Sequence, residues 1–596
     1  MPSQKYHSLF RISSLWLLII VLLLGIFFRF AKLENKIFWV DEVATAVRVS
    51  GYTISEVIDD LKAKDVVSRR DLLAYQVINK ERSLRDSWQA LSNSPEHAPL
   101  YFLLTRFWLQ LWGNSIGVMR SLSAWLSLLI FPCLYWLLEE LFNKPFISYL
   151  GIAFMSVSPF YVAYAQEARP YSLWTVTILL MGASFLRAIR LNNKQSWAWY
   201  TVSLILGFYT SLLSLFIAFF HGIYLLLVTL KNKQQLIKNY IIVSAIALCC
   251  FSPWLYIIAT KIQTLQDNTT WMRSSMEFAA LVATWIGTIL LIFGDLPLSP
   301  DADAVQIAIA VLTLFIVMVA IFWLSIMWHQ LKGRVKQIVV YLGLVFLLFA
   351  TIGLILFHSY FSLDIVTLIG AIVAVFILAL AGYSLFFLLR HSKLERGLFI
   401  VCLLISLPLP LILYDIISLG QSSGAPRYFI PTQLAIQIAA TYTLGTKIKN
   451  GYSKNFKQQK VWQIITILFL TLGVFSCTRN LNLSPIYLKS RNIHNPQIAE
   501  IINRERNPLI VIEPVMVTDV LSLSHYFSNN TKIKLINGDN LLLQYEDFSA
   551  VYTLNPSAKL ISKFSEQKRL KLERTYQPKL LAPGQITLNL WQIKYY

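Results

Sequence analysis

Long apolar runs separated by short polar loops dominate most of the chain. The first run covers residues 15–30, and similar runs recur up to residue 478. A helix needs about 20 consecutive apolar residues to cross the hydrocarbon core of a bilayer, so each run predicts a membrane-spanning helix. We expect about thirteen such helices, at residues 15–30, 119–141, 147–166, 171–189, 197–211, 212–230, 239–258, 304–330, 337–357, 364–389, 397–417, 428–446 and 461–478.

Two further apolar segments do not fit as full crossings. Residues 98–112 are too short to cross and predict a helix that lies in the membrane interface. Residues 278–298 predict a segment that is re-entrant or lies flat on the membrane. Residues 31–118, between the first two spans, then form a long first outer loop that contains interfacial helices.

The last part of the chain, residues 479–596, has a different pattern. Short runs of β-branched and other apolar residues bounded by polar ones are typical of strands. They predict a helix at residues 519–527 and strands at 508–513, 532–537 and 586–594. The segment is long enough for a small core. We therefore divide the chain into a membrane domain, residues 1–478, and a C-terminal α/β domain, residues 479–596.

Composition and charge agree with a polytopic helical membrane protein and orient it. Of 596 residues, 56% are hydrophobic and 14% are charged, and the mean hydropathy is +0.57. The net charge of +21 comes mainly from short loops between apolar runs, so a nucleic-acid partner is not expected. Basic loops remain in the cytoplasm. Counting crossings from a cytoplasmic N-terminus places every basic loop inside the cell and the C-terminal domain outside. The basic loops are residues 187–194, 231–238, 332–336, 390–396 and 447–460.

Cysteines and glycine motifs exclude several kinds of site. All five cysteines lie inside apolar runs, which excludes a disulfide framework and a zinc site of the cysteine type. The sequence contains no phosphate-binding glycine loop, which disfavours a nucleotide-driven pump.

Three polar stretches on the predicted outer side lie close to the membrane boundary. They are Trp39-Val-Asp-Glu42, Glu96-His-Ala-Pro-Leu-Tyr101 and Gln166-Glu-Ala-Arg-Pro-Tyr171. Ionisable groups so close to lipid are costly, so they usually line an aqueous cavity or pair with an opposite charge. The acidic pair alone is equally compatible with a solvated loop end.

In this order and spacing the three stretches resemble the membrane glycosyltransferases of the C fold. The most similar branch contains the protein O-mannosyltransferases and the bacterial aminoarabinose transferases that modify lipid A. That family pattern has an Asp-Glu pair in the first outer loop, a His-Pro-Pro-Leu-Tyr-like helix start and a Glu-Ala-Arg-Pro-Tyr-like corner. Here Ala98 replaces one proline. The resemblance covers about residues 15–230, and beyond that mainly topology and Pro426-Arg-Tyr428.

The resemblance implies displacement at the anomeric carbon of a sugar carried on a lipid phosphate. Such chemistry needs a carboxylate base and positive charge on the departing phosphate. Asp41 matches the catalytic aspartate of the family, with Glu42 in support. Arg169 and Arg427 are the candidates for phosphate binding, because a guanidinium grips phosphate with two bonds; the alternative is an interfacial snorkelling charge. Glu167 is expected to brace Arg169 or bind the acceptor.

The remaining polar residues have more than one interpretation. Tyr101, Tyr171 and Tyr428 are candidates for stacking on a sugar, although tyrosines are common at membrane boundaries. His97 is expected to cap the helix start or to bind sugar hydroxyls. Glu96 and His97, with the acidic pair, are also candidate ligands for a divalent metal ion. No soluble cofactor is implied.

These observations predict an inverting glycosyltransferase in a membrane, with a bacterial inner or plasma membrane as the expected location. The donor would be a polyprenyl-phosphate-linked sugar, and the acceptor a hydroxyl of a lipid, glycan or protein outside the cytoplasm. One alternative is a transporter or flippase of lipid-linked sugars, which predicts inverted repeats and broken midplane helices. A polymerase or ligase of lipid-linked sugars and a non-catalytic membrane scaffold are two more.

Overall fold

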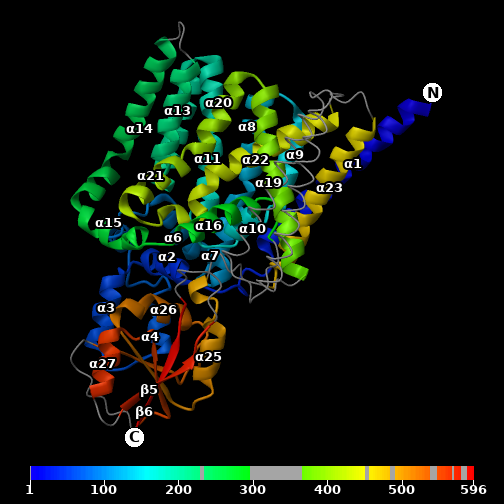
Figure 1. Cartoon of the computed structure of the whole chain (residues 1–596). Coiled ribbons are helices and arrows are strands. Elements are labelled where there is room, and N and C mark those ends of the chain that lie inside the picture. Colours follow the sequence, from blue (N-terminus) through cyan, green and yellow to red (C-terminus); the bar gives the residue numbers. More distant parts are fainter. Residues whose placement is uncertain are drawn as a thin grey trace, which may run out of the picture.

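The computed structural model describes residues 2–228, 234–295, 365–449, 456–482, 490–536, 547–566, 570–578 and 587–595. Figure 1 shows a bundle of long helices above a sheet that contains the C-terminal end. The predicted spans at residues 304–330 and 337–357 lie outside the described residues.

A long buried helix, α22 (Ile430–Lys449), runs through the centre of the bundle. Every residue from Ile430 to Thr446 is buried, including Gln433 and Gln437. Helix α22 contacts α9, α19, α20 and α23, so protein instead of lipid surrounds its polar groups. The other helices of the bundle are α1 (Pro2–Phe30), α7 (Ile116–Leu128), α8 (Ile130–Phe142), α9 (Pro145–Ser156), α10 (Pro159–Ala165), α11 (Tyr171–Leu191), α12 (Lys194–Thr210), α13 (Ser214–Val228), α14 (Gln234–Thr260), α19 (Ile365–His391), α20 (Leu394–Ile405), α21 (Pro408–Ser418) and α23 (Phe456–Arg479).

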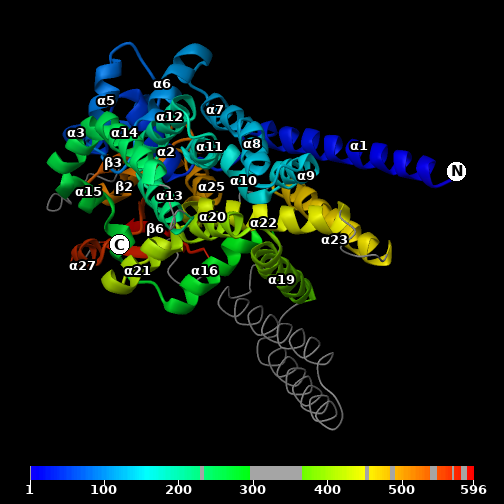
Figure 2. The same cartoon turned by 90° about the horizontal axis from the view of Figure 1, so that it is seen from above.

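Several of these helices are long and apolar enough to cross a membrane. The described ranges contain six such segments, or seven if a bent pair is counted as one span. The chain is therefore an integral multi-pass membrane protein, while the predicted count of about thirteen spans is not confirmed. Seen from above, α1 points away from the bundle at its N-terminal end (Figure 2).

Two runs predicted as single spans remain single candidate crossings, Ile116–Phe142 and Leu394–Ser418, although the helix in each has a short interruption. Residues 119–141 form α7 and α8, which meet at Leu129. Residues 397–417 form α20 and α21, and Pro408 lies in the first turn of α21. Proline has no backbone N–H and clashes with the preceding turn, so a helix restarts there more easily than it continues.

The run at residues 147–166, which was predicted as one straight span, is bent. It bends by 61° between α9 and α10, and Pro159 opens α10. The bend leaves carbonyl groups at the end of α9 without helical partners. The buried guanidinium of Arg29 donates to the carbonyls of Met155 (3.0 Å) and Ser156 (2.6 Å), which stabilises the break.

The predicted first outer loop, residues 31–118, folds into short helices and one two-residue strand. The helix predicted at residues 98–112 is present as α6, and its exposed side chains include Leu111 and Trp112. Residues 278–298 contain α16 (Phe278–Leu290), which is too short for a full crossing. The elements of the loop are α2 (Val40–Ser50), α3 (Ile54–Ala63), β1 (Val67–Ser68), α4 (Arg69–Ala74), α5 (Leu84–Ser92) and α6 (Leu100–Trp112).

A six-stranded sheet occupies the C-terminal part, in the order β1-β3-β2-β4-β6-β5. The central strand β2 is parallel to both of its neighbours, and the other pairs are antiparallel. The elements are η4 (Ser490–Asn492), α25 (Asn495–Asn503), β2 (Pro508–Ile512), η5 (Pro514–Met516), α26 (Val517–Leu523), β3 (Lys532–Leu535), β4 (Ala550–Leu554), α27 (Ala558–Glu566), β5 (Leu570–Tyr576) and β6 (Leu590–Tyr595).

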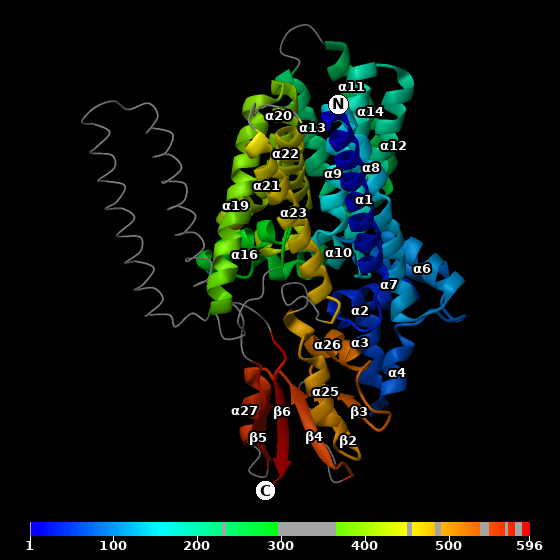
Figure 3. The ribbon, with the colours of Figure 1, turned by 90° about the vertical axis from the view of Figure 1, so that its right-hand side faces the viewer.

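Alternating side chains of β2 cover the two faces of this sheet. Ile510 and Ile512 belong to the large core that includes residues of α25 and α26, whereas Leu509 and Val511 pack with α27. The edge strand β1 comes from the predicted first outer loop and pairs with β3. The sheet therefore crosses the predicted boundary at residue 478, and Figures 1 and 3 show α2 and α26 together at the junction with the bundle.

Candidate functional site

Helix α2 separates the two residues of the acidic pair. Trp39 is extended, and Asp41 and Glu42 occupy the first turn of the helix, where the helix dipole favours negative charge. Consecutive helical residues point in different directions. Glu42 therefore faces the interior and is fully buried, whereas the Asp41 side chain is 26% exposed.

The Asp41 carboxylate lies between two guanidinium groups. Its Oδ2 atom is 4.0 Å from Nε of Arg169 and 4.0 Å from a terminal nitrogen of Arg427. The three residues are far apart in sequence and meet where α2, the α10–α11 corner and η3 (Pro426–Phe429) converge. Both separations exceed hydrogen-bond length, so these contacts are ion pairs without a direct hydrogen bond.

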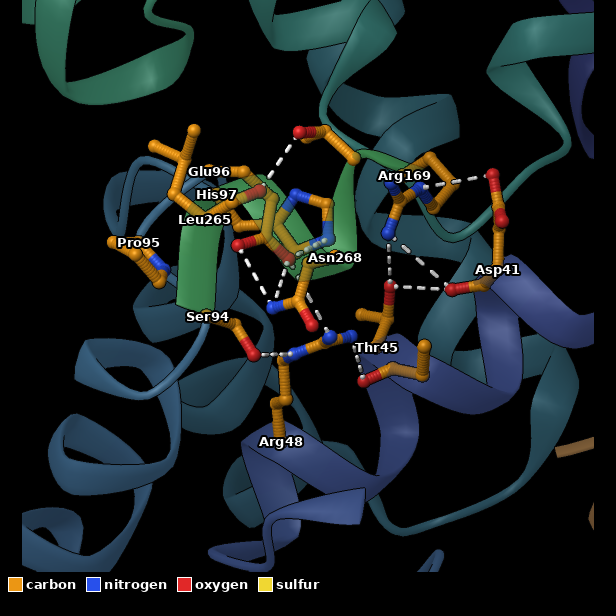
Figure 4. Close-up of polar contacts among 12 residues, drawn as sticks. Asp41, Thr45, Arg48, Ser94, Pro95, Glu96, His97, Arg169, Leu265 and Asn268 are labelled. Carbon is orange, nitrogen blue, oxygen red and sulfur yellow. Dashed lines mark hydrogen bonds and ion pairs between the residues drawn. The ribbon is translucent and has the colours of Figure 1, made fainter. Parts of the chain in front are cut away.

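Arg169 is fixed by backbone, side-chain and ring contacts. It donates to the Asp41 carbonyl (3.3 Å) and to the Thr45 hydroxyl (3.2 Å), one turn further along α2 (Figure 4). Its guanidinium lies 6.0 Å from the ring centroid of Phe102 and 5.8 Å from that of Tyr171. Tyr171 is thus buried beside the candidate site, against a cation.

Arg427 is held by two aromatic rings. Its guanidinium lies 5.5 Å from the ring centroid of Tyr428 and 5.7 Å from that of Trp271 in η1 (Thr270–Arg273). The backbone N–H of Gln421 donates to the Met272 carbonyl (2.8 Å), which ties η1 to the turn before Arg427. Trp271 was not predicted, because nothing in the sequence brings its loop to Arg427.

Glu42 is paired with an arginine that the sequence-based prediction missed. Both Glu42 oxygens accept hydrogen bonds from Arg120 of α7 at 2.7 Å, and both side chains are fully buried. The backbone N–H of Ala168 donates to Glu42 Oε1 (2.9 Å). This geometry fits a group that positions α2 better than one that reacts. Arg120 is a charge inside an apolar run, and that was the available signal.

Glu96 and His97 form a second polar cluster beside the first. The Asn268 amide donates to both Glu96 oxygens (3.1 Å each), and Arg48 lies 3.9 Å away (Figure 4). His97 Nε2 is 3.6 Å from Glu96 Oε1. Burial, followed by the charges of Arg48, Arg169 and Arg427, lowers the pKa of His97 well below its usual value, so its imidazole is neutral at pH 7.

The candidate metal ligands Glu96 and His97 are not joined by a third ligand in this cluster. Within the described residues, no group of three histidine, cysteine, aspartate or glutamate side chains is arranged to hold a metal ion. Glu96 and His97 are close to each other, but Asn268 and Arg48 satisfy the Glu96 carboxylate instead.

Two other predicted substrate contacts lie away from any open surface. Tyr101 is fully buried, and its hydroxyl bonds the Ser123 hydroxyl (2.7 Å), so it joins α6 to α7 instead of facing a sugar. Glu167 is also fully buried, at the corner next to Arg169. Tyr428 is partly exposed and remains available for stacking.

Comparison with known proteins agrees with the predicted resemblance. Residues 96–257 match the family model of dolichyl-phosphate-mannose-protein mannosyltransferases. The fold is similar to that of ArnT from Cupriavidus metallidurans bound to undecaprenyl phosphate, with a TM-score of 0.50, 9% identity and coverage of 97% of this chain and 98% of that chain. The chain resembles the C-fold membrane glycosyltransferases. The family-model match at residues 96–257 includes the second and third polar stretches.

Another C-fold structure is less similar. The oligosaccharyltransferase from Archaeoglobus fulgidus in complex with zinc and sulfate has a TM-score of 0.43 and 11% identity, over 86% of this chain and 61% of that chain. A search of curated proteins gives no match to the sequence.

Proposed function

We propose that the chain is an inverting glycosyltransferase that moves a sugar from a polyprenyl-phosphate donor to an acceptor hydroxyl outside the cytoplasm. The observation that carries the proposal is the Asp41 carboxylate, 4.0 Å from both Arg169 and Arg427. One site thus offers a proton acceptor and two cations, as displacement of a phosphate from a sugar requires. The similarity to ArnT bound to undecaprenyl phosphate supports the lipid-phosphate donor.

The proposed reaction needs only residues of this site. The acceptor oxygen attacks the anomeric carbon while Asp41 takes the hydroxyl proton. The bond between that carbon and the phosphate oxygen breaks, and its electron pair leaves with the phosphate. Arg427 is 20% exposed and binds the departing charge, while the more buried Arg169 supports the carboxylate and the phosphate from behind. Attack opposite the leaving group inverts the configuration.

Turnover of labelled donors tests the base directly. Purified protein is incubated with labelled undecaprenyl-phosphate sugars and with lipid, glycan and protein acceptors. Loss of a general base lowers the rate by about 10²- to 10⁴-fold, so the transfer rate of Asp41→Asn should be lower than that of wild type by this factor. Asp59→Asn is the matched control, because Asp59 lies on α3 with a 74% exposed side chain.

Each result of this assay has a clear meaning. If Asp41→Asn consumes donor at the wild-type rate, Asp41 is not the base. If no donor and acceptor pair gives turnover but labelled lipid moves across proteoliposome membranes, the protein is a transporter and not a transferase. Transfer of whole oligosaccharides in preference to single sugars would favour a ligase.

A further inference from the structure

The short segment that precedes Asp41 is held by the C-terminal part of the chain. The Phe38 carbonyl accepts a hydrogen bond from the Ser522 hydroxyl, and the Phe38 N–H donates to the Tyr526 hydroxyl (3.4 Å). The Val40 N–H donates to Oδ1 of Asn492 (3.0 Å). These hydrogen bonds connect the start of α2, next to the proposed base, to residues more than 450 positions away.

The bond to Val40 replaces a missing helix cap. The first N–H groups of a helix have no intrahelical partner, and a side chain at the N-cap usually satisfies one of them. The N-cap of α2 is Trp39, which makes no such bond. Asn492 is fully buried and supplies an acceptor to the first residue of the helix from outside.

A second set of bonds orients the Asn492 amide. Its Nδ2 donates to Oδ1 of Asp519 in α26 (3.2 Å), and Asp519 is fully buried. Arg491 binds both Asp519 oxygens, at 2.8 and 2.5 Å. Because the amide nitrogen must face the carboxylate, the amide oxygen faces the Val40 N–H.

We propose that Asn492, oriented by Asp519 and Arg491, is a positioning residue that sets the start of α2 and thereby aims the Asp41 carboxylate at the acceptor hydroxyl. The inference rests on the proposed function, and it gives the C-terminal part of the chain a place in the transfer reaction. A displacement of about 1 Å at a reacting group can cost about 100-fold in rate, so a cap one residue away from the base has a large effect.

The kinetic test compares two asparagines of the C-terminal part. Asn492→Ala should lower kcat by about tenfold or more while the donor KM changes by less than about threefold, because the proposed donor phosphate site is at Arg427 and does not include Asn492. Asn507→Ala is the matched control: Asn507 donates to the Asp547 carbonyl (3.0 Å), far along the chain from α2. Rates are expressed per folded molecule, from the monomer fraction of each sample.

A double-variant cycle shows whether Asn492 acts through Asp41. If it does, Asn492→Ala should add little to the loss already caused by Asp41→Asn, because the group it positions is gone. If the two losses multiply, or if Asn492→Ala keeps the wild-type kcat, the proposal is overturned.

Hydrogen exchange keeps the proposal testable if the transferase function fails. In the full-length protein in detergent, backbone amides of residues 38–44 should exchange about tenfold faster in Asn492→Ala than in wild type or Asn507→Ala. Unchanged exchange would overturn the positioning role whatever the reaction. If exchange is faster in Asn492→Ala but the wild-type protein consumes no donor, the proposed function is refuted and the contact between α2 and Asn492 is established.

Discussion

The buried pair between Glu42 and Arg120 gives the strongest stability prediction. Arg120 donates five hydrogen bonds at 2.6–3.0 Å, two to Glu42 and three to the carbonyls of Leu33, Lys36 and Ile37. Arg120→Ala leaves a fully buried carboxylate without its cation. Breaking a buried pair on one side costs about 3–5 kcal/mol, so we expect a large loss of stability.

A pair of similar geometry whose arginine is exposed provides the control. Arg190 makes two hydrogen bonds of 2.9 Å to Glu140, but its side chain is 57% exposed. The Glu140 side chain is 6% exposed, but Arg187 lies 3.9 Å from it and the Trp136 indole N–H donates to it (3.2 Å), so Arg190→Ala does not leave this carboxylate without a partner. Pairs with an exposed partner contribute about 0–1 kcal/mol, so Arg190→Ala should change stability little. The measurement is the midpoint of thermal unfolding in detergent, followed by tryptophan fluorescence.

A double variant separates loss of the pair from loss of packing. Glu42→Ala combined with Arg120→Ala removes both charges, so its midpoint should fall by less than the sum of the two single shifts. Equal shifts for Arg120→Ala and Arg190→Ala, or a double variant that matches the sum, would refute the interpretation of this pair.

Three further predictions concern packing, pH and topology. A Cβ on Gly25 would lie 2.4 Å from the Ser156 carbonyl oxygen, so Gly25→Ala should destabilise the protein by about 1–3 kcal/mol. Gly287→Ala is the control, because a Cβ there would meet no atom within 4 Å. Similar unfolding midpoints for the two variants would contradict the contact between α1 and α9. Burial, with nearby arginines, lowers the pKa of His525 to about 4, so its contribution to stability is present above about pH 6.5 and lost as the pH falls toward 4. His525→Asn should flatten that decline in the unfolding midpoint, and an unchanged pH profile would exclude the histidine. In a cysteine-free background, Ala558→Cys should react with a membrane-impermeant maleimide in intact cells; labelling only after permeabilisation would reverse the proposed orientation.

Much of the local structure could be predicted from hydrophobic periodicity. The helix at α6 and the strands β2 and β3 lie close to their predicted positions, because their apolar patterns match the period of each element. The bend in the run at residues 147–166 was harder to predict. Pro159 signals a possible break, but the 61° bend depends on Arg29 reaching the end of α9 from another helix.

In the candidate site, too, some features could be predicted from the sequence and others depend on the tertiary structure. Composition and the apolar runs were enough to predict a multi-pass membrane protein, and the resemblance of the three polar stretches to C-fold enzymes predicted a glycosyltransferase. The pairing of Arg120 with Glu42, the position of Arg169 and Arg427 around Asp41, and the cap that Asn492 gives to α2 became visible only in three dimensions. Those contacts join segments tens to hundreds of residues apart, and charge and burial act through space, so periodicity along the chain carries no record of them.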